Sequence, residues 1–269
     1  MRVRSLGLHT DLALHGWRGR IRDRHDHLVV TFPAAPGFRG GNLLVFERPP
    51  EASDMRRWCD LFDTAIGVPP TYPFRSFGWD GLDGEEGELA PFLAAGFERE
   101  PEVILAAPRL VAPSVPNRDV RIVALTDDAA WQAAVRVQAT ASARRRSASY
   151  QRILQTVMAA NRRLVRSGHG IWWGAFEGDV LVANVGIFRI GELARFQALV
   201  TAPAWQRRGI AATLLHHAAE AARGVWGSEL VLLASEQAGP GLGVYARAGL
   251  VPIEQRVGLG QSRPSSSTA

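Results

Sequence analysis

The sequence has no lysine, a single cysteine and no long apolar run, and each of these absences narrows the class of protein. The lone Cys59 cannot form an intrachain disulfide, so a disulfide-stapled secreted scaffold is excluded. No stretch of 18 or more consecutive apolar residues is present, so no segment predicts a transmembrane helix. The basic N-terminal segment has too short and broken an apolar run for a signal peptide. We therefore expect a cytoplasmic protein without a membrane partner.

Because the sequence has no lysine, its 31 basic residues other than histidine are all arginine, and the net charge is +5. The arginines are spread along the chain, with Arg144 to Arg146 as the only triplet. No alternation of basic and aromatic residues predicts a platform on which bases could stack. This pattern is more typical of a composition bias than of a surface for a polyanion, so we predict no nucleic-acid partner.

The length and the hydrophobic content of the chain suffice for two α/β domains. The length of 269 residues and a hydrophobic content of 46% can fill two cores. Residues 111–118 include two prolines and little that could pack, which predicts a linker. The expected domains are therefore 1–110 and 119–261, followed by a disordered tail, 262–269, that is rich in serine.

Strand and helix patterns alternate in both predicted domains. In the first, residues 1–26 predict a loop or a frayed helix, because few apolar residues recur there in any period. The strands expected after it are 27–32, 43–46, 71–80 and 102–107, with helices at 54–66 and 86–95. In the second, the expected strands are 120–125, 170–176, 180–190, 193–201 and 229–234, with helices at 126–139 and 150–166 and a further helix after Gly209.

The most informative stretch runs from Leu199 to Arg223. A strand-like run is closed by Ala202-Pro203, and an almost wholly apolar helix follows Gly209. A loop before a helix N-terminus leaves backbone N–H groups unpaired, and the helix dipole favours an anion there. Gly209 would let the backbone approach that anion closely, and Arg207 and Arg208 add long-range attraction. This stretch predicts a site for a pyrophosphate.

The spacing Gln206-x-x-Gly209-x-Ala211 resembles the [QR]-x-x-G-x-[GA] signature of the GNAT acetyltransferase superfamily. The resemblance implies a GNAT fold, in which a mixed central sheet is flanked by helices. It also implies that this loop holds the pyrophosphate of acetyl-CoA, and that the preceding strand pairs with the pantetheine arm. The cofactor-binding residues that it implies are Leu199, Val200, Thr201, Gln206, Arg207, Arg208, Gly209, Ile210, Ala211 and Ala212.

A second segment, Val244 to Leu250, is similar to the Y-x-x-x-G-F pattern that ends the last GNAT helix. The resemblance implies that Tyr245 protonates the departing CoA thiolate, a role that suits a phenol chemically. Two departures stand against the pattern. Leu250 replaces the phenylalanine, and Ala238 occupies a position where the family often has an asparagine that contacts the cofactor.

The general base is not identified by the sequence. Several GNAT enzymes use a glutamate on the cofactor strand, but the matching residue here is Arg195, which cannot accept a proton. Glu192, at the start of that strand, is the nearest carboxylate and is the candidate we name. Glu177 and Glu236 are further candidates, and each carboxylate also fits a turn or surface position.

The first domain resembles a GNAT half without the cofactor loop, and its stretch Pro36 to Asn42 is of the kind found in such degenerate domains. That domain would either form a wall of the substrate pocket or serve stability and dimerisation. The sequence does not choose between these roles, and a homodimer is left open.

The resemblance as a whole implies an acetyl-CoA-dependent N-acetyltransferase that acts on a primary amine of a small molecule or peptide by direct attack in a ternary complex. Two alternatives stay open. One is an acyl-CoA-binding module without turnover, and the other is a tandem GNAT aminoacyl transferase, against which the intact CoA loop argues.

Overall fold

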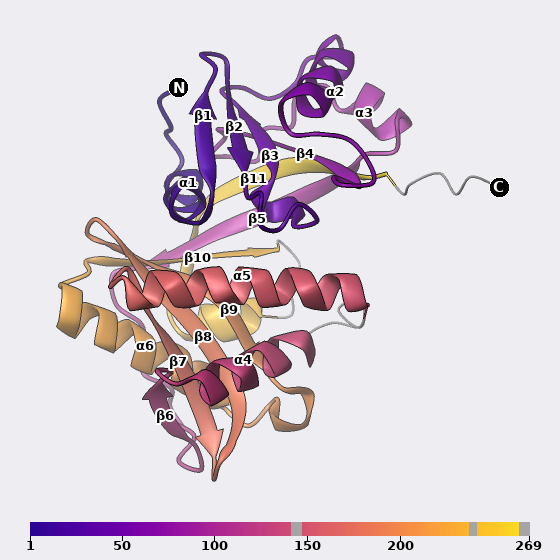
Figure 1. Ribbon diagram of the computed structural model, residues 1–269. Coiled ribbons are helices and arrows are strands. Elements are labelled where there is room, and N and C mark those ends of the chain that lie inside the picture. Colours follow the sequence, from indigo (N-terminus) through magenta and orange to yellow (C-terminus); the bar gives the residue numbers. More distant parts are fainter. Residues whose placement is uncertain (141–146, 237–240, 264–269) are drawn as a thin grey trace. The chain divides into compact units, whose positions relative to one another are not determined.

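The computed structural model describes residues 1–140, 147–236 and 241–263, which form two compact units (Figure 1). The first unit comprises Met1–Ile104 with the described residues from Glu254 onward, and the second comprises Leu105–Ile253. The units thus divide within strands β5 (Glu98–Ala107) and β11 (Val251–Ser262), and not at the proline-rich segment 111–118. The reason is strand pairing: β11 forms an antiparallel ladder with β4 of the first unit, from Gly258 to Ser262.

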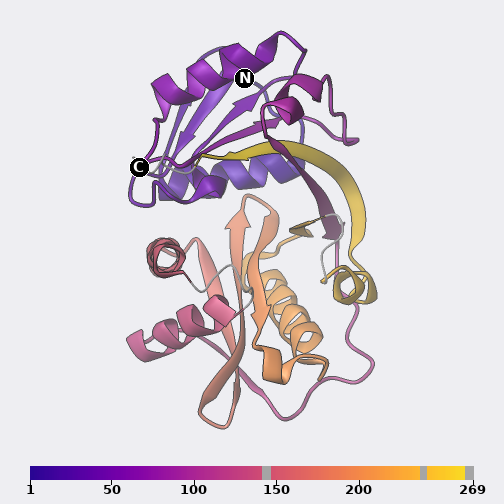
Figure 2. The same cartoon turned by 90° about the vertical axis from the view of Figure 1, so that its right-hand side faces the viewer.

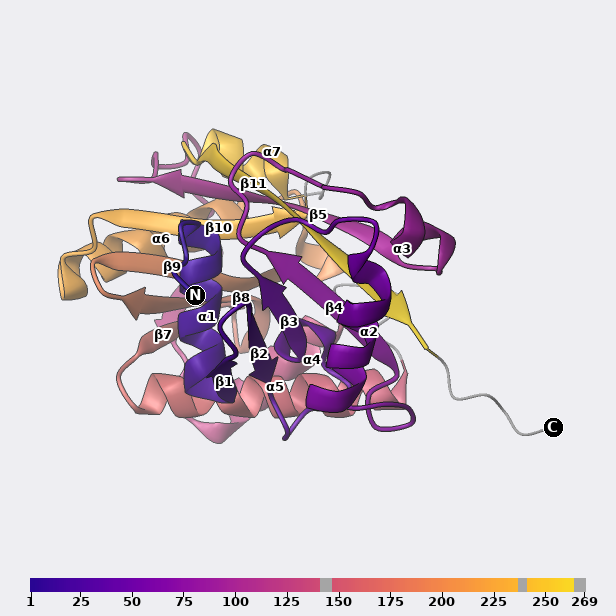
Figure 3. The same ribbon diagram turned by 90° about the horizontal axis from the view of Figure 1, so that it is seen from above.

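The first unit is a mixed sheet with strand order β1-β2-β3-β4-β11-β5. Its first three strands form an antiparallel meander, and β3 runs parallel to β4 after a helical crossover through α2 (Figure 3). The remaining elements of this unit, besides β5 and β11, are α1 (Leu6–Arg18), β1 (Arg20–Asp23), β2 (His27–Thr31), the 3-10 helix η1 (Arg39–Gly41), β3 (Leu43–Phe46), α2 (Asp54–Ala65), β4 (Phe74–Trp79) and α3 (Ala90–Ala94).

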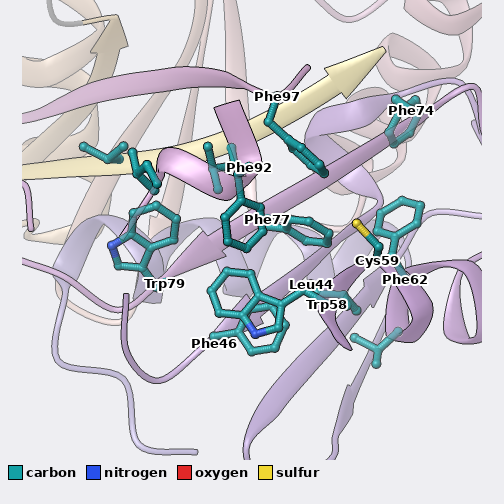
Figure 4. Packing of buried hydrophobic residues seen from close by; sticks show 14 residues of the cluster. Leu44, Phe46, Trp58, Cys59, Phe62, Phe74, Phe77, Trp79, Phe92 and Phe97 are labelled. Carbon is teal, nitrogen blue, oxygen red and sulfur yellow. The ribbon is translucent and has the colours of Figure 1, made fainter. Parts of the chain in front are cut away.

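Helices α1 and α2 cover opposite faces of this sheet (Figure 2). Side chains alternate along the strands accordingly: Val29 joins the cluster under α2, while Leu28 and Val30 pack with α1. The cluster under α2 is aromatic, and Phe46 stacks on Trp58 with ring centroids 3.7 Å apart (Figure 4). The other aromatic residues of this cluster are Phe62, Phe74, Phe77, Trp79, Phe92 and Phe97.

Helix α1 and strand β1 lie where the sequence predicted a loop or a frayed helix, so that prediction was wrong. The Ser5 hydroxyl accepts a hydrogen bond from the Leu8 amide, as an N-cap does. The buried carboxylate of Glu254 accepts bonds from the Ser5 hydroxyl at 2.6 Å and from the Leu6 and Gly7 amides at 2.7 and 3.0 Å. Because Glu254 is almost 250 residues away in the chain, no local pattern could reveal that this helix end is satisfied.

We expect Glu254→Gln to lower the free energy of unfolding by about 2 kcal/mol, because a neutral amide replaces a charged acceptor of three buried hydrogen bonds. Urea denaturation followed by circular dichroism measures the change. Glu98→Gln, at an exposed position of the same unit, is the matched control and should unfold like wild type. Equal midpoints for Glu254→Gln and wild type would contradict this account of α1.

The second unit is also a mixed sheet, with strand order β10-β9-β8-β7-β6. Strands β6 to β9 are antiparallel, and β9 pairs with β10 in parallel after the crossover helix α6. Helices α4 and α5 cover one face and α6 covers the other (Figure 2). Besides the ends of β5 and β11, its elements are β6 (Arg121–Ala124), α4 (Asp128–Thr140), α5 (Ala148–Arg166), β7 (Gly170–Glu177), β8 (Val180–Ile190), β9 (Leu193–Thr201), the 3-10 helix η3 (Pro203–Trp205), α6 (Ile210–Trp226), β10 (Leu230–Glu236) and α7 (Leu242–Arg247).

Both units follow one plan: a three-stranded antiparallel meander, a crossover helix, a parallel strand and a short helix. In the first unit these elements are β1 to β3, α2, β4 and α3. In the second they are β7 to β9, α6, β10 and α7. The mixed sheets flanked by helices confirm the predicted α/β fold class, and the repeated plan agrees with two related halves.

The chain stays ordered beyond the predicted start of the tail. Ser262 ends β11, and Arg263 donates hydrogen bonds to Asp63 Oδ1 at 2.8 Å and to the Phe74 carbonyl at 3.0 Å. The rest of the predicted tail, 264–269, and the arginine triplet at 144–146 lie outside the described residues. In the described parts of the chain, no helix combines the length and apolar character needed to span a bilayer.

Candidate functional site

The turn between β9 and α6 leaves a helix N-terminus open. Gly209 precedes the helix in the left-handed region, with φ 78° and ψ −2°, which favours glycine. No side chain caps the helix, so the N–H groups of Ile210, Ala211 and Ala212 have no intrahelical partner and no cap. On the strand side, Gln206 Nε2 donates to the Thr201 carbonyl at 3.1 Å, which ties the turn to the end of β9. Such an uncapped helix N-terminus can bind an anion, as the sequence predicts for this turn.

In the described part of the chain, the pairing of β9 with β10 lies at the beginnings of both strands. Their parallel ladder runs from Leu193 opposite Leu230 to Arg195 opposite Leu232, whereas the strands continue to Thr201 and Glu236. The Ala202 amide donates to β8 at 2.8 Å. Since backbone groups alternate in direction along a strand, those of Thr201 face the opposite edge, toward the side of β10. This edge offers hydrogen bonds to an extended ligand.

A β-bulge interrupts β9 within this unpaired part. Gly186 lies opposite Gln197 and Asn184 opposite Val200, so two residues of β9 face one of β8. One of the two, Ala198, has φ 53°, which is strained for a residue other than glycine. Its carbonyl accepts a hydrogen bond of 2.5 Å from Gln138 Nε2 of α4, which holds the bulge in place.

Gln138 belongs to a buried polar network that sequence reasoning missed. Its Nε2 also donates to Asn184 Oδ1 at 2.8 Å, and Trp172 Nε1 donates to the same oxygen at 3.0 Å. Both Gln138 and Asn184 are at most 2% exposed. The only available signal was Asn184 itself, a polar residue in the otherwise apolar run from Val180 to Phe188.

The two arginines of the turn have different surroundings. Arg208 Nη2 contacts Glu177 Oε1 at 2.5 Å and Asp119 Oδ2 at 3.4 Å. Hydrogen bonds from Trp205 and Arg208 lower the pKa of Glu177, so its carboxylate is charged at neutral pH. Arg207 is exposed, and among the described residues it has no ion-pair partner. Arg207 is therefore free to meet an anion, while Arg208 must first leave its carboxylates.

We expect Glu177→Gln to raise the affinity of this turn for inorganic pyrophosphate by about twofold to fivefold, because an exposed ion pair that competes with the anion for Arg208 is removed. Asp179→Asn is the matched control, since Asp179 lies in the same β7–β8 turn, is exposed and does not contact Arg208. Calorimetric titration at low ionic strength measures both variants. An unchanged or weaker affinity in Glu177→Gln alone would show that the Arg208 ion pair does not compete with the ligand.

Tyr245 lies in α7, which packs against α6. Its ring covers Gly241, where an added methyl would come within 2.8 Å of the tyrosine hydroxyl. Burial raises the pKa of Tyr245, so the phenol stays protonated at neutral pH. No hydrogen bond to this hydroxyl is formed by the residues in the described ranges, which leaves it free to donate. Ala238, at the family's usual asparagine position, lies outside the described residues.

The structure does not bring Glu192 to this site. Glu192 is exposed in the turn before β9, and the bulge at Ala198 lies six positions further along the chain, a span of about 20 Å in an extended strand. Glu177 is near the turn but holds Arg208. His217 of α6 packs edge-on against Trp173 with ring centroids 4.5 Å apart, and burial lowers its pKa. The side chain of Glu236 lies outside the described residues, so no general base is assigned.

The corresponding place in the first unit is closed. The β3–β4 ladder runs to the ends of both strands at Phe46 opposite Trp79, and the Asp80 amide extends it by donating to the Phe46 carbonyl. The first residue of α2 is Asp54, whose carboxylate accepts a hydrogen bond from the Glu51 amide. A carboxylate at a helix N-terminus opposes a phosphate, so only the second unit presents the open arrangement.

The geometry of the second unit agrees with the comparisons with known proteins. Residues 137–250 match the model of the acetyltransferase (GNAT) family. No curated protein matches the chain significantly.

Solved structures share the fold at low sequence identity. A GCN5-related N-acetyltransferase from Kribbella flavida is 15% identical with a TM-score of 0.67, and the match covers 99% of this chain and 98% of that one. A conserved protein of unknown function from Staphylococcus epidermidis is 15% identical with a TM-score of 0.70, covering 91% and 94%. A tandem GNAT protein from the clavulanic acid biosynthesis pathway is 16% identical with a TM-score of 0.52, covering 78% and 69%.

The fold of the chain is therefore the fold of these GNAT structures. The segment that matches the family model, residues 137–250, lies within the second unit and contains the turn at Gly209 and Tyr245.

Proposed function

We propose that the protein is an N-acetyltransferase that moves an acetyl group from acetyl-CoA to a primary amine of a small molecule or peptide. The proposal rests on two neighbouring features. One is the uncapped helix N-terminus after Gly209, and the other is the strand edge at Leu199 to Thr201, which does not pair with β10. The first would take the pyrophosphate and the second the pantetheine arm, so one elongated ligand satisfies both.

In the proposed reaction, the amine nitrogen attacks the thioester carbonyl carbon, the C–S bond breaks, and the amide product forms. Tyr245 would donate its phenolic proton to the departing thiolate, and solvent would take the proton that the amine loses. The chain's main contribution is to hold the thioester in a fixed geometry beside the acceptor. The buried network of Gln138 and Asn184 supports this by fixing the bulge in β9.

The experiment is a thiol-release assay with the full chain, acetyl-CoA and a panel of primary amines, followed by mass spectrometry of the products. An amine-dependent release of CoA with an acetylated product supports the proposal. Binding of acetyl-CoA without turnover on any amine would favour the alternative of a non-catalytic acyl-CoA-binding module. The open anion site argues against an aminoacyl transferase that needs no CoA loop.

A further inference from the structure

The segment 109–119, called the strap below, lies along α6 in the second unit. At one end Arg109 forms a two-pronged ion pair with Glu220, at 3.0 and 3.1 Å. At the other end the Asn117 amide donates to Thr213 Oγ1 at 2.9 Å. The strap therefore runs antiparallel to α6, from its C-terminal half toward the open N-terminus. It has no regular secondary structure, but it is held at both ends.

The strap ends against the turn that forms the anion site. The Val115 carbonyl oxygen lies 3.5 Å from where a Cβ at Gly209 would be. Asn117 Nδ2 donates to the Arg208 carbonyl at 2.8 Å, and Asn117 Oδ1 accepts from the amides of Asp119 and Val120 at 3.0 and 3.1 Å. One side chain thus fixes its own turn and also the peptide bond before Gly209.

The orientation of that peptide bond matters for anion binding. In a trans peptide the C=O and the following N–H point in opposite directions. Because Asn117 holds the Arg208 carbonyl, the Gly209 N–H points away from the strap. A rotation of this peptide would replace an N–H donor by a carbonyl oxygen on the anion's side, which a phosphate would repel.

We infer that Asn117 is a positioning residue for the pyrophosphate-binding turn: it acts through the Arg208–Gly209 peptide and does not touch the acyl or amine groups. This inference rests on the proposed function. The inference predicts different effects on the two halves of the ligand. The strap forms hydrogen bonds with the turn and with α6, but not with the β9 edge proposed for the pantetheine arm.

The test compares acetyl-CoA with S-acetylpantetheine, which lacks the pyrophosphate. The variants are Asn117→Ala and Asn117→Ser, where serine can still accept the turn hydrogen bonds but cannot reach the Arg208 carbonyl. Calorimetry measures acetyl-CoA, saturation-transfer NMR measures S-acetylpantetheine, and thermal unfolding reports the fold. We expect both variants to bind acetyl-CoA about tenfold more weakly, which is the size of effect that one hydrogen bond can have. The affinity for S-acetylpantetheine should stay within about twofold.

Two results would overturn the inference alone. Wild-type affinity in Asn117→Ser would show that only the local turn matters, and an equal loss for both ligands would show a general loosening of the unit. Wild-type protein that binds neither ligand would overturn the proposed function, and the role of Asn117 with it.

Discussion

Gly209→Asp is expected to weaken acetyl-CoA binding by at least about 100-fold. The substitution places a carboxylate at the open N-terminus of α6, where the pyrophosphate is proposed to lie. Like charges about 4 Å apart repel by about 4 kcal/mol at an effective dielectric constant of about 20, which exceeds the loss needed for this effect. Calorimetric titration measures the change.

Gly209→Asn is the matched control for the charge. Asparagine has the shape of aspartate and tolerates the left-handed conformation that Gly209 adopts at φ 78°. We expect this variant to bind within about tenfold of wild type. If the two variants lose the same affinity, backbone strain and not charge repulsion is the cause, and an anion at this helix end is not supported.

Tyr245→Phe is expected to lower kcat by about 100-fold, the lower end of the usual effect of a general acid. The affinity for acetyl-CoA should change by no more than about twofold, because the ring and its packing on Gly241 remain. Steady-state kinetics with an accepted amine, together with calorimetry, separates the two quantities. Tyr72→Phe in the first unit controls for the loss of a phenol elsewhere.

The pH dependence of the rate is a second test of the role of Tyr245. Burial raises the pKa of Tyr245 above its ordinary value of 10.0, so the phenol keeps its proton through the neutral and mildly alkaline range. At any pH up to 10, ionisation of Tyr245 should therefore not lower the wild-type rate. A Tyr245→Phe variant with wild-type kcat would remove Tyr245 from the mechanism.

Local patterns predicted the parts of the site that local physics controls. The strand before Thr201, the glycine at a left-handed position and the apolar helix after it all follow from residues that are neighbours in sequence. The predicted strands and helices of the second unit agree with the structure to within a few residues. For the strand Leu193–Thr201, the predicted first and last residues are those of β9 in the structure.

What the sequence could not show depends on partners that are distant in the chain. Helix α1 is stabilised by Glu254, and β11 belongs to the first unit because it pairs with β4. Glu192 is close to the site in sequence but lies at the far end of β9, since an extended strand separates residues by over 3 Å each. The polar residues Gln138 and Asn184 meet only when α4 packs on the sheet.

Amide hydrogen exchange with and without acetyl-CoA tests the central claim most directly, because it reports where the ligand binds. The account predicts slower exchange in peptides that cover 196–214, which include the free edge of β9 and the start of α6. Peptides that cover 43–57, the closed counterpart in the first unit, should exchange at the same rate in both samples. Unchanged exchange over 196–214, or protection over 43–57 instead, would contradict it.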